Sequence, residues 1–279
     1  MAGLQEIVHI LPLGHEYDRA VAPFKKHSVD RVYILSVTKN TGNYADVMLE
    51  RQIYFTGKVR TFFEKRKIET VQVEVELFDI LEVMRHISAI IKEEHGNGNS
   101  VHLNVSACGR KTAIGAALAG MANGATVYYV SAETYALDYH SFEEHGLSIC
   151  ESGNTFAFEN FEFDLPNSVC QKILIKLYQE DRGLRTTSIR EFLHTEGVEG
   201  FEIHVDAIPS ASKEVFKKDS SDKSVSKREE SIAQAIKLEK KYLGPLERSG
   251  YIRRERSGRN NIIYITESGK YVACINGMI

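Results

Sequence analysis

The chain has 279 residues, of which 43% are hydrophobic and 26% charged, and its formal net charge at pH 7 is −3. This composition is typical of a globular protein with room for two domains, and it excludes collagen-like, coiled-coil and low-complexity chains. No apolar run approaches the length of a membrane span, and Glu6 and His9 interrupt the first one, which excludes a signal peptide. We therefore expect a soluble, cytoplasmic protein with no membrane partner.

The four cysteines, Cys108, Cys150, Cys170 and Cys274, are scattered along the chain. No Cys-x-x-Cys motif and no Cys/His spacing accompanies them, so the sequence predicts neither a zinc site nor a disulfide framework. We expect reduced, structural thiols and no metal. Cys108 alone lies in a turn that we assign to ligand binding, where a helix N-terminus could lower its pKa.

The first half of the chain alternates apolar strands with helical segments. Residues 6–13, 31–37, 70–78, 101–105 and 126–131 have the composition of strands, and residues 19–24, 44–67 and 80–94 have apolar residues at helical spacing. Asp79 is the expected N-cap of the third helix. Because strands and helices alternate, we predict an α/β domain with a parallel, Rossmann-like sheet covered by helices on both faces.

The most informative stretch is residues 104–120, NVSACGRKTAIGAALAG. It is predicted to end the fourth strand, turn sharply at Gly109 and begin a helix whose small residues pack close to the sheet. The turn directs backbone N–H groups and the positive end of the helix dipole outward, and Arg110 and Lys111 add two cations. This combination suits a phosphate.

Other polar loops are expected at the same edge, because the carboxyl ends of parallel strands lie along one side of a sheet. His15 could contact a base or a ribose hydroxyl. The predicted ligand-binding residues are Gly14, His15, Asp18, Thr38, Lys39, Asn40, Ser106, Ala107, Cys108, Gly109, Arg110 and Lys111.

The pattern changes after the fifth strand. Residues 147–149 and 155–158 are predicted antiparallel strands at one edge of the sheet, and residues 165–168 form a boundary between a ligand-sensing domain, 1–165, and a second domain, 166–279. The second domain should contain helices at 169–179, 187–194 and 227–248, strands at 251–256 and 261–265, and a short final helix. A kink is expected at Gly244-Pro245.

The second domain is the basic half of the chain. Residues 1–165 hold 15 Lys/Arg and 22 Asp/Glu, a net of −7, whereas residues 166–279 hold 20 and 16, a net of +4. Helices followed by a basic hairpin indicate a winged helix-turn-helix with its recognition helix at residues 226–243. The predicted DNA-binding residues are Arg228, Gln234 and Lys237 for base edges, and Lys240, Lys241, Arg253, Arg254, Arg256 and Arg259 for phosphates. Six phosphate contacts would give a slope of log affinity against log salt of roughly −5.

Two resemblances extend this interpretation. The run LERSGYIRRERSGRNNIIYITESGKYV resembles the wing of MarR-like and other bacterial and archaeal winged-helix regulators. The first half, through Asn104, Ser106, Gly109, Arg110 and Lys111, resembles a CARF domain, the CRISPR-associated Rossmann fold. Together they resemble archaeal CRISPR-linked transcriptional regulators, whose family ligand is a cyclic oligoadenylate. The turn Ser106-Ala107-Cys108 departs from the more glycine- and threonine-rich turn of many CARF domains, which leaves the ring size of the ligand open.

The resemblance implies a homodimeric transcription regulator that binds double-stranded DNA and senses a cyclic oligoadenylate, with cyclic tetra-adenylate as the expected form and no cofactor. Activation and derepression fit equally well. One alternative is a metal-independent ring nuclease that cleaves the same ligand, with Lys111 or Arg110 stabilising charge and His15 as acid or base. The other is a DNA reader with a different nucleotide ligand. A dinucleotide enzyme is disfavoured, because no GxGxxG follows the first strand.

Overall fold

The computed structural model describes residues 5–39, 42, 44–160, 162–202, 220–257 and 260–277. The chain divides into two compact units, Met1–Asp164 with Cys274–Ile279, and Leu165–Ala273. The last six residues therefore group with the N-terminal unit, although the sequence analysis places them in the second domain. None of the helices in the described part of the chain is long and apolar enough to cross a membrane.

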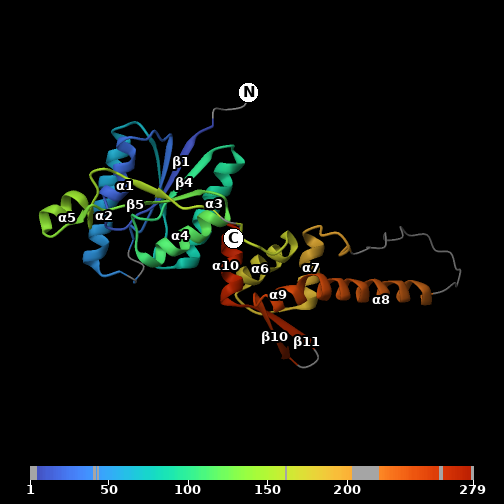
Figure 1. Cartoon of the computed structure of the whole chain (residues 1–279). Helices are drawn as coiled ribbons and strands as arrows, with labels where there is room; N and C mark the ends of the chain where they lie inside the picture. Colours follow the sequence, from blue (N-terminus) through green and yellow to red (C-terminus); the bar gives the residue numbers. More distant parts are fainter. Residues whose placement is uncertain are drawn as a thin grey trace, which may run out of the picture. The chain divides into compact units, whose positions relative to one another are not determined.

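The N-terminal unit is built on a six-stranded sheet in the order β3-β2-β1-β4-β5-β8. Of these strands, Figure 1 labels β1, β4 and β5. The first five strands in the chain are parallel, and β8 pairs antiparallel with β5 at the edge. The strands are β1 (Ile7–Pro12), β2 (Arg31–Ser36), β3 (Glu69–Glu74), β4 (Ser100–Asn104), β5 (Thr126–Val130) and β8 (Thr155–Ala157). The predicted Rossmann-like α/β class is confirmed.

Helices and a small two-stranded sheet complete this unit. Its helical segments are α1 (Asp18–Val21), the 3-10 helix η1 (Ala22–Lys25), α2 (Asp46–Glu64), α3 (Ile80–Gly96), α4 (Arg110–Ala122) and α5 (Tyr139–His145). Strands β6 (Thr134–Tyr135) and β7 (Ser148–Ile149) pair antiparallel with each other. Asp79 caps α3 as predicted, since its carboxylate accepts hydrogen bonds from the N–H groups of Leu81 and Glu82.

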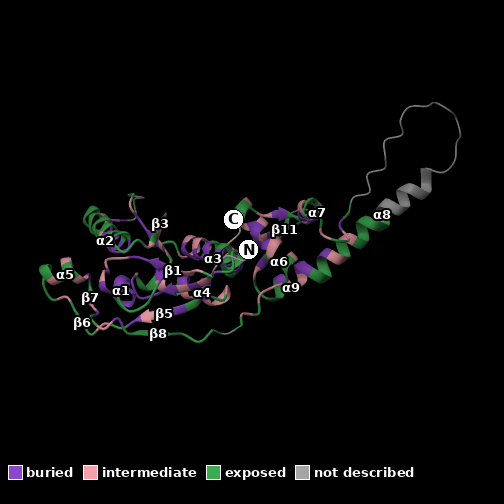
Figure 2. Ribbon diagram, turned by 90° about the horizontal axis from the view of Figure 1, so that it is seen from above, coloured by how far each residue is buried: buried purple, intermediate pink, exposed green. Residues whose placement is uncertain are grey.

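Small residues let α4 pack closely, as the sequence predicts. A Cβ atom at Gly120 would lie 2.6 Å from the side chain of Leu103 and 2.7 Å from that of Val127, and one at Gly115 would lie 2.7 Å from Ile80. Leu103 and Val127 are fully buried. Figure 2 shows the same burial along the central strand β1. Burying a side chain such as Leu103 contributes about 2 kcal/mol.

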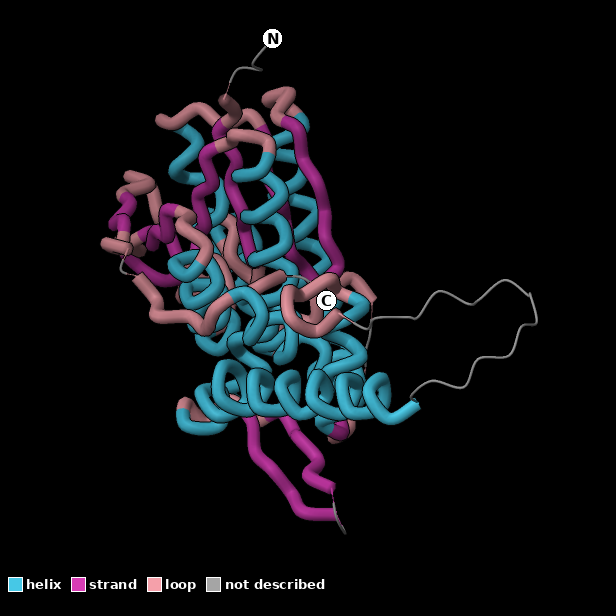
Figure 3. Tube along the Cα trace, turned by 90° about the vertical axis from the view of Figure 1, so that its right-hand side faces the viewer, coloured by secondary structure: helices cyan, strands magenta, loops and turns pink. Residues whose placement is uncertain are grey.

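The C-terminal unit combines a helical bundle with a hairpin. Its elements are α6 (Ser168–Glu180), β9 (Leu184–Arg185), α7 (Thr186–Thr195), α8 (Ser220–Lys237), the π-helical segment η2 (Leu238–Leu243), α9 (Gly244–Arg248), β10 (Ile252–Ser257), β11 (Asn260–Ile265) and α10 (Glu267–Ile275). The sheet order is β10-β11-β9, and the β10–β11 hairpin extends away from the helices of its own unit (Figure 3). The expected irregularity near Pro245 takes the form of the π-helical turn just before it, because proline lacks the N–H that regular helix pairing needs.

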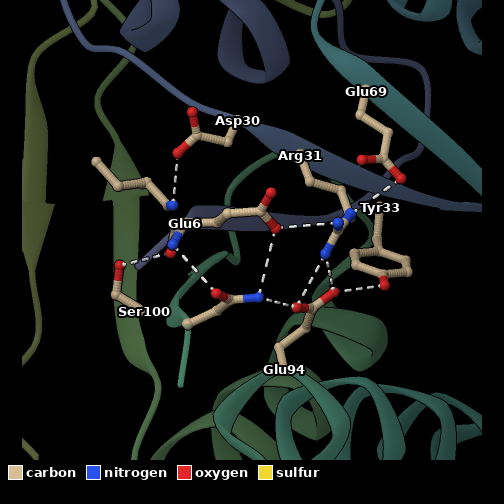
Figure 4. Close-up of polar contacts among 9 residues, drawn as sticks. Glu6, Asp30, Arg31, Tyr33, Glu69, Glu94 and Ser100 are labelled. Carbon is tan, nitrogen blue, oxygen red and sulfur yellow. Dashed lines mark hydrogen bonds and ion pairs between the residues drawn. The ribbon is translucent and has the colours of Figure 1, made fainter. Parts of the chain in front are cut away.

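A polar network fixes the amino ends of the strands in the N-terminal unit (Figure 4). Arg31 donates to the carboxylate of Glu94 at 2.8 and 3.0 Å and forms ion pairs with Glu6 and Glu69, both at 3.0 Å. Tyr33 donates to Glu94 at 2.6 Å, and the amide of Asn99 does so at 2.6 Å. Glu94 is only 1% exposed, so each of these contacts offsets the cost of burying its charge.

Candidate functional site

The strand order places a topological switch point between β1 and β4. From β1 the chain continues to β2 and β3 on one side of the sheet, and from β4 it continues to β5 on the other side. The loops after the neighbouring strands β1 and β4 therefore lead in opposite directions. These loops meet: the N–H of Gly14 donates to the carbonyl of Ala107 at 2.7 Å. In open α/β sheets ligands bind in the crevice at such a point. Two of the predicted segments, 14–18 and 106–111, therefore lie together at the favoured place.

Asn104 holds the turn after β4 in shape. Its side-chain oxygen accepts hydrogen bonds from the N–H of Ser106 at 2.9 Å and from its hydroxyl at 2.5 Å, and its amide donates to the carbonyl of Arg19 at 2.9 Å. Arg19 in turn donates to the carbonyl of Ser106 at 3.1 Å. Ser106 is 2% exposed. In this structure its hydroxyl is engaged within the turn.

The N-terminus of α4 lies open beside this turn. Gly109 is the N-cap, and no side chain of the described residues caps the helix there. Gly109 is exposed, as are Arg110 and Lys111. The first N–H groups of the helix and two cations thus lie at the surface, an arrangement that favours an anion.

Neither glycine at the crevice is required by the fold. Gly109 has φ −64° and ψ 155°, an extended conformation open to any residue, so the predicted need for glycine in a sharp turn is wrong. A Cβ atom there would come no nearer than 3.8 Å to a neighbouring atom, and one at Gly14 no nearer than 3.5 Å. Gly14 likewise lies outside the left-handed region. The absent side chains leave the backbone open to close approach by another molecule.

Lys111 is held toward the loop after β3. Its ammonium donates to the carbonyl of Phe78 at 2.6 Å, and the hydroxyl of Thr112 donates to the carbonyl of Leu77 at 2.7 Å. Tyr44 stacks on Phe78 with ring centroids 4.7 Å apart. The exposed Lys111 makes a single bond of this kind, so its charge remains accessible to an anion at the helix N-terminus.

The loop after β2 is organised by one carboxylate, Glu74 at the end of β3. It accepts hydrogen bonds from the N–H groups of Thr38 at 2.7 Å and Lys39 at 3.1 Å, and from the hydroxyl of Thr38. Thr38 and Lys39 reach the carboxyl edge as predicted by their place in the chain. Asn40 lies outside the described residues.

His15 and Asp18 are turned toward other elements. A ring nitrogen of His15 lies 3.0 Å from the carbonyl of Met48, and burial lowers the pKa of His15, which leaves a neutral imidazole at pH 7. Asp18 is 6% exposed, and its carboxylate lies 3.0 Å from a ring nitrogen of His145 and accepts from the N–H of Cys150 at 3.0 Å. Asp18 also lines a hollow of about 780 Å³ between α1 and α2.

Glu16 is a titratable residue of the crevice that the sequence analysis does not single out. It is 6% exposed and accepts hydrogen bonds from the hydroxyl and N–H of Ser148 at 2.9 and 3.0 Å. Burial outweighs these bonds and raises the pKa of Glu16 to about 7. The local sequence does not predict the burial of Glu16 or its bonds to Ser148, because Ser148 lies 132 residues away in the chain.

Cys108 differs from expectation. Burial, with a smaller contribution from the charge of Glu16, raises the pKa of its thiol to about 12. The expected lowering by the helix N-terminus is therefore wrong, and the thiol is protonated at neutral pH. Among the described residues no group of three or more His, Cys, Asp or Glu side chains is arranged to hold a metal ion.

The predicted DNA-binding residues divide into paired and accessible cations. Arg254 is clamped by Glu239 at 2.7 Å through both terminal nitrogens and by Glu247 at 3.0 Å. Arg253 pairs with Glu255, and its guanidinium lies 4.6 Å from the centroid of the Tyr264 ring. Exposed positions are Lys240, Lys241, Arg253 and Arg256.

The predicted base-reading residues lie on a flank of α8. Gln234 donates to the carbonyl of Glu202 at 3.0 Å, and Lys237 donates to that of Glu199 at 2.6 Å. Both side chains are thus engaged by the segment that follows α7. The side chain of Arg228 and the whole of Arg259 lie outside the described residues.

Comparison with known protein families assigns both halves of the chain. Residues 7–135 match a family model described as HFX_2341_N-like, N-terminal. Residues 169–277 match the DUF6293 C-terminal winged helix domain. The second match establishes that the C-terminal domain is a winged helix, as predicted. No curated protein matches the chain.

Solved structures offer distant likenesses. Protein VC1899 from Vibrio cholerae is 13% identical with a TM-score of 0.39, and covers 97% of this chain and 64% of its own. Can2 from Sulfobacillus thermosulfidooxidans, in complex with cyclic tetra-adenylate, is 11% identical with a TM-score of 0.38. The match covers 97% of this chain and 63% of Can2. Enterococcus italicus Csm6, bound to cyclic hexa-2′-fluoro-hexa-dAMP, is 12% identical with a TM-score of 0.38. The match covers 88% of this chain and 59% of Csm6. This chain spans less than two thirds of each of these proteins, and TM-scores below 0.5 carry no functional assignment.

Proposed function

We propose that the protein is a ligand-responsive, DNA-binding transcription regulator whose N-terminal domain binds a cyclic oligoadenylate at the β1/β4 switch point. The observation that carries the proposal is the pair Gly14 and Gly109. Both lie at the crevice, and neither backbone conformation nor packing demands a glycine. A ligand that approaches the backbone closely explains both.

The electrostatics of the crevice support a phosphodiester ligand. The α4 N-terminus is open at Gly109, and Arg110 and Lys111 lie in its first turn. Two buried side-chain atoms without a partner among the described residues, Nε of Arg19 and Oγ of Ser36, belong to this edge of the sheet. Both atoms are buried from solvent, so they show incomplete hydrogen bonding inside this edge, and the exposed Arg110 and Lys111 are the groups that an anion would meet.

The CARF resemblance narrows the anion to a cyclic oligoadenylate, and cyclic tetra-adenylate is the form to test first. A ring with rotational symmetry is shared most simply by two subunits across a two-fold axis, which favours a homodimer. The winged helix domain would contact duplex DNA through accessible cations such as Lys241, Arg253 and Arg256. Ligand and DNA are then coupled only as far as the ligand binds the DNA-competent and incompetent states differently.

The proposal is tested by thermal unfolding with and without cyclic tetra-adenylate. Saturating ligand at about 100 times its Kd should stabilise the wild-type chain by about 2.7 kcal/mol. Lys111→Ala should weaken binding about tenfold or more, since a charge-assisted hydrogen bond is lost. Lys26→Ala is the matched control, because Lys26 is also exposed and also donates to one backbone carbonyl, that of Ser152 at 2.8 Å, away from the crevice. A ligand shift unchanged in Lys111→Ala would move the site elsewhere.

Gly109→Val provides a second test at the same crevice. The extended φ and ψ of Gly109 accommodate valine, and the nearest atom to a new Cβ is 3.8 Å away, so the free variant should fold and lose about 1 kcal/mol at most, because valine is a poorer N-cap than glycine. The side chain would occupy the approach to the α4 N-terminus and abolish the ligand shift. Retained binding at wild-type affinity would contradict the role given to this glycine.

The ring nuclease is the alternative activity, and one observation favours it. The lowered pKa of His15 keeps its imidazole in the neutral form that accepts a proton from a ribose 2′-hydroxyl. The same samples, analysed for linear oligoadenylate over time, separate the two functions. Stoichiometric binding without linear product supports the regulator, and turnover that His15→Ala abolishes supports the nuclease.

A further inference from the structure

Helix α8 presents an apolar outward face to solvent in the winged helix domain. Ile232 and Ile236 are 51% and 50% exposed, while Leu238 and Tyr242, further along the same continuous helical segment, are 2% and 3% exposed in the core. Figure 2 shows the described part of α8 as mostly exposed. Two isoleucines four residues apart lie on one helix face, and their exposure has a cost that a folded domain usually avoids.

The residues along this face follow a regular spacing. Glu229, Ala233 and Ile236 of α8 and Lys240 of η2, which continues it, are separated by four, three and four residues, and all four are exposed. This is the heptad spacing of a helix that packs along a second helix. We refer to these four residues as the α8 stripe, which Ile232 flanks on one side.

The order of charge and size along the α8 stripe makes it complementary to its own copy. In an antiparallel pair related by a two-fold axis that passes between Gln234 and Ala235, Glu229 lies opposite Lys240, and the small Ala233 lies opposite the large Ile236. The same contacts recur on the other side of the axis. We infer that the α8 stripe is an antiparallel helix-pairing surface whose partner is α8 of a second copy of this chain.

The alternative occupant of this face is the major groove of DNA, and the charges argue against it. Glu229 and Glu230 are exposed on this part of α8 and would approach phosphates. Gln234 and Lys237, the polar residues best suited to base edges, are engaged by the carbonyls of Glu202 and Glu199. The inference goes beyond the proposed function and does not depend on the ligand, since it concerns how two winged helix domains pair.

Cross-linking in the full chain tests the pairing. In the antiparallel pair, the two copies of residue 233 are offset by about 4.5 Å along the helices, whereas those of residue 241 are about 20 Å apart. Ala233→Cys should therefore form a covalent dimer with a short bismaleimide. Lys241→Cys is the matched control, because Lys241 is exposed in η2, which continues α8, but is beyond the reach of the cross-linker. The wild type supplies the background, since Cys150, Cys170 and Cys274 are buried and Cys108 is half-buried.

Charge exchange makes the test specific to the α8 stripe. In the Ala233→Cys chain without DNA, Glu229→Lys should lower the cross-linked fraction about tenfold, because two ion pairs become two repulsions. Adding Lys240→Glu should restore it. Equal cross-linking at positions 233 and 241, or failure of the double exchange to restore it, would overturn the inference. So would a Glu229→Lys chain that binds DNA more tightly while its cross-linking is unchanged, since the face would then meet DNA.

Discussion

Two buried glutamates at opposite ends of the same sheet have their pKa values displaced in opposite directions. Burial alone would raise the pKa of Glu94, but hydrogen bonds from Tyr33, Asn99 and Arg31 outweigh it and lower the value. Burial dominates at Glu16, where Ser148 is the direct partner, and raises the pKa to about 7. The amino edge of the sheet therefore compensates its charges, and the carboxyl edge leaves its charge poorly compensated.

This difference separates polar groups that hold the fold from polar groups available to a ligand. At the amino edge Arg31 is bonded to three carboxylates, those of Glu6, Glu69 and Glu94. At the carboxyl edge, Nε of Arg19 and Oγ of Ser36 are buried without a partner among the described residues. The amino-edge network pairs its charges, whereas the carboxyl edge leaves hydrogen-bonding capacity unused at some cost in stability.

The strongest challenge to this comparison removes the centre of the amino-edge network. Glu94→Gln leaves Arg31 and Tyr33 facing a neutral amide in a buried site, and we expect a loss of about 3 kcal/mol in the free energy of unfolding. Urea unfolding at pH 7 measures it. Glu93→Gln, at the exposed neighbouring position, should change stability by less than about 0.5 kcal/mol. Ligand affinity should be unaffected, and a variant that lost binding while it remained folded would couple the two edges.

The pH dependence of stability distinguishes the two glutamates by sign. The folded-state pKa of Glu94 is lowered, so its contribution is present above the unfolded pKa of about 4.3 and is lost as pH falls through the folded value. The folded-state pKa of Glu16 is raised, so it makes stability fall as pH rises from about 4.3 to about 7. Glu94 therefore contributes to the loss of stability in acid, and Glu16 contributes to the loss of stability as pH rises toward neutral.

Glu16→Gln should remove the second effect, which is worth about 3 kcal/mol across that range. The measurement is the slope of unfolding free energy between pH 5 and pH 7.5, as urea unfolding gives it. Glutamine cannot accept both hydrogen bonds that Ser148 donates to Glu16, and this loss lowers stability by the same amount at every pH. The pH slope, and not the stability at one pH, is therefore the quantity to compare. Glu144→Gln, whose side chain is 61% exposed, should leave the slope as it is. A wild-type slope that survives Glu16→Gln would assign it to another group.

Periodicity made the fold predictable. Strand and helix patterns over residues 6–131 fix the order of elements, and right-handed connections between parallel strands leave few topologies. The meeting of segments 14–18 and 106–111 could be predicted because both loops follow parallel strands, whose carboxyl ends lie along one edge of the sheet. The basic hairpin at residues 251–265 identified the wing in the same way.

The bonding within the site could not be predicted. Asn104 and Ser106 are two residues apart, but the turn also depends on Arg19, which lies 85 residues from Asn104. Glu74 organises Thr38 from a strand 36 residues away, and Ser148 meets Glu16 across 132 residues. Such contacts depend on side-chain geometry after folding. The sequence therefore predicted which loops lie together but not which polar atoms are already paired within them.

The wing shows the same contrast between a paired and an unpaired charge, here in two arginines that are two residues apart. The side chain of Arg254 is 17% exposed and is held by Glu239 and Glu247, whereas Arg256 is exposed. With Arg254 committed to the fold and Lys240 to the α8 stripe, four of the six expected phosphate contacts remain, for a slope of log affinity against log salt of roughly −3.6.

Arg256→Ala should reduce the magnitude of that slope by about 1 and leave the melting temperature unchanged. Arg254→Ala should leave the slope intact and lower the free energy of unfolding by about 1 kcal/mol, because it unpairs two glutamates on neighbouring elements. Fluorescence anisotropy with a labelled duplex over a range of KCl concentrations gives the slope, and urea unfolding gives the stability. If the two variants differ in this way, Arg254 stabilises the wing and Arg256 contacts DNA. If both variants reduce the magnitude of the slope equally, both guanidinium groups contact phosphates.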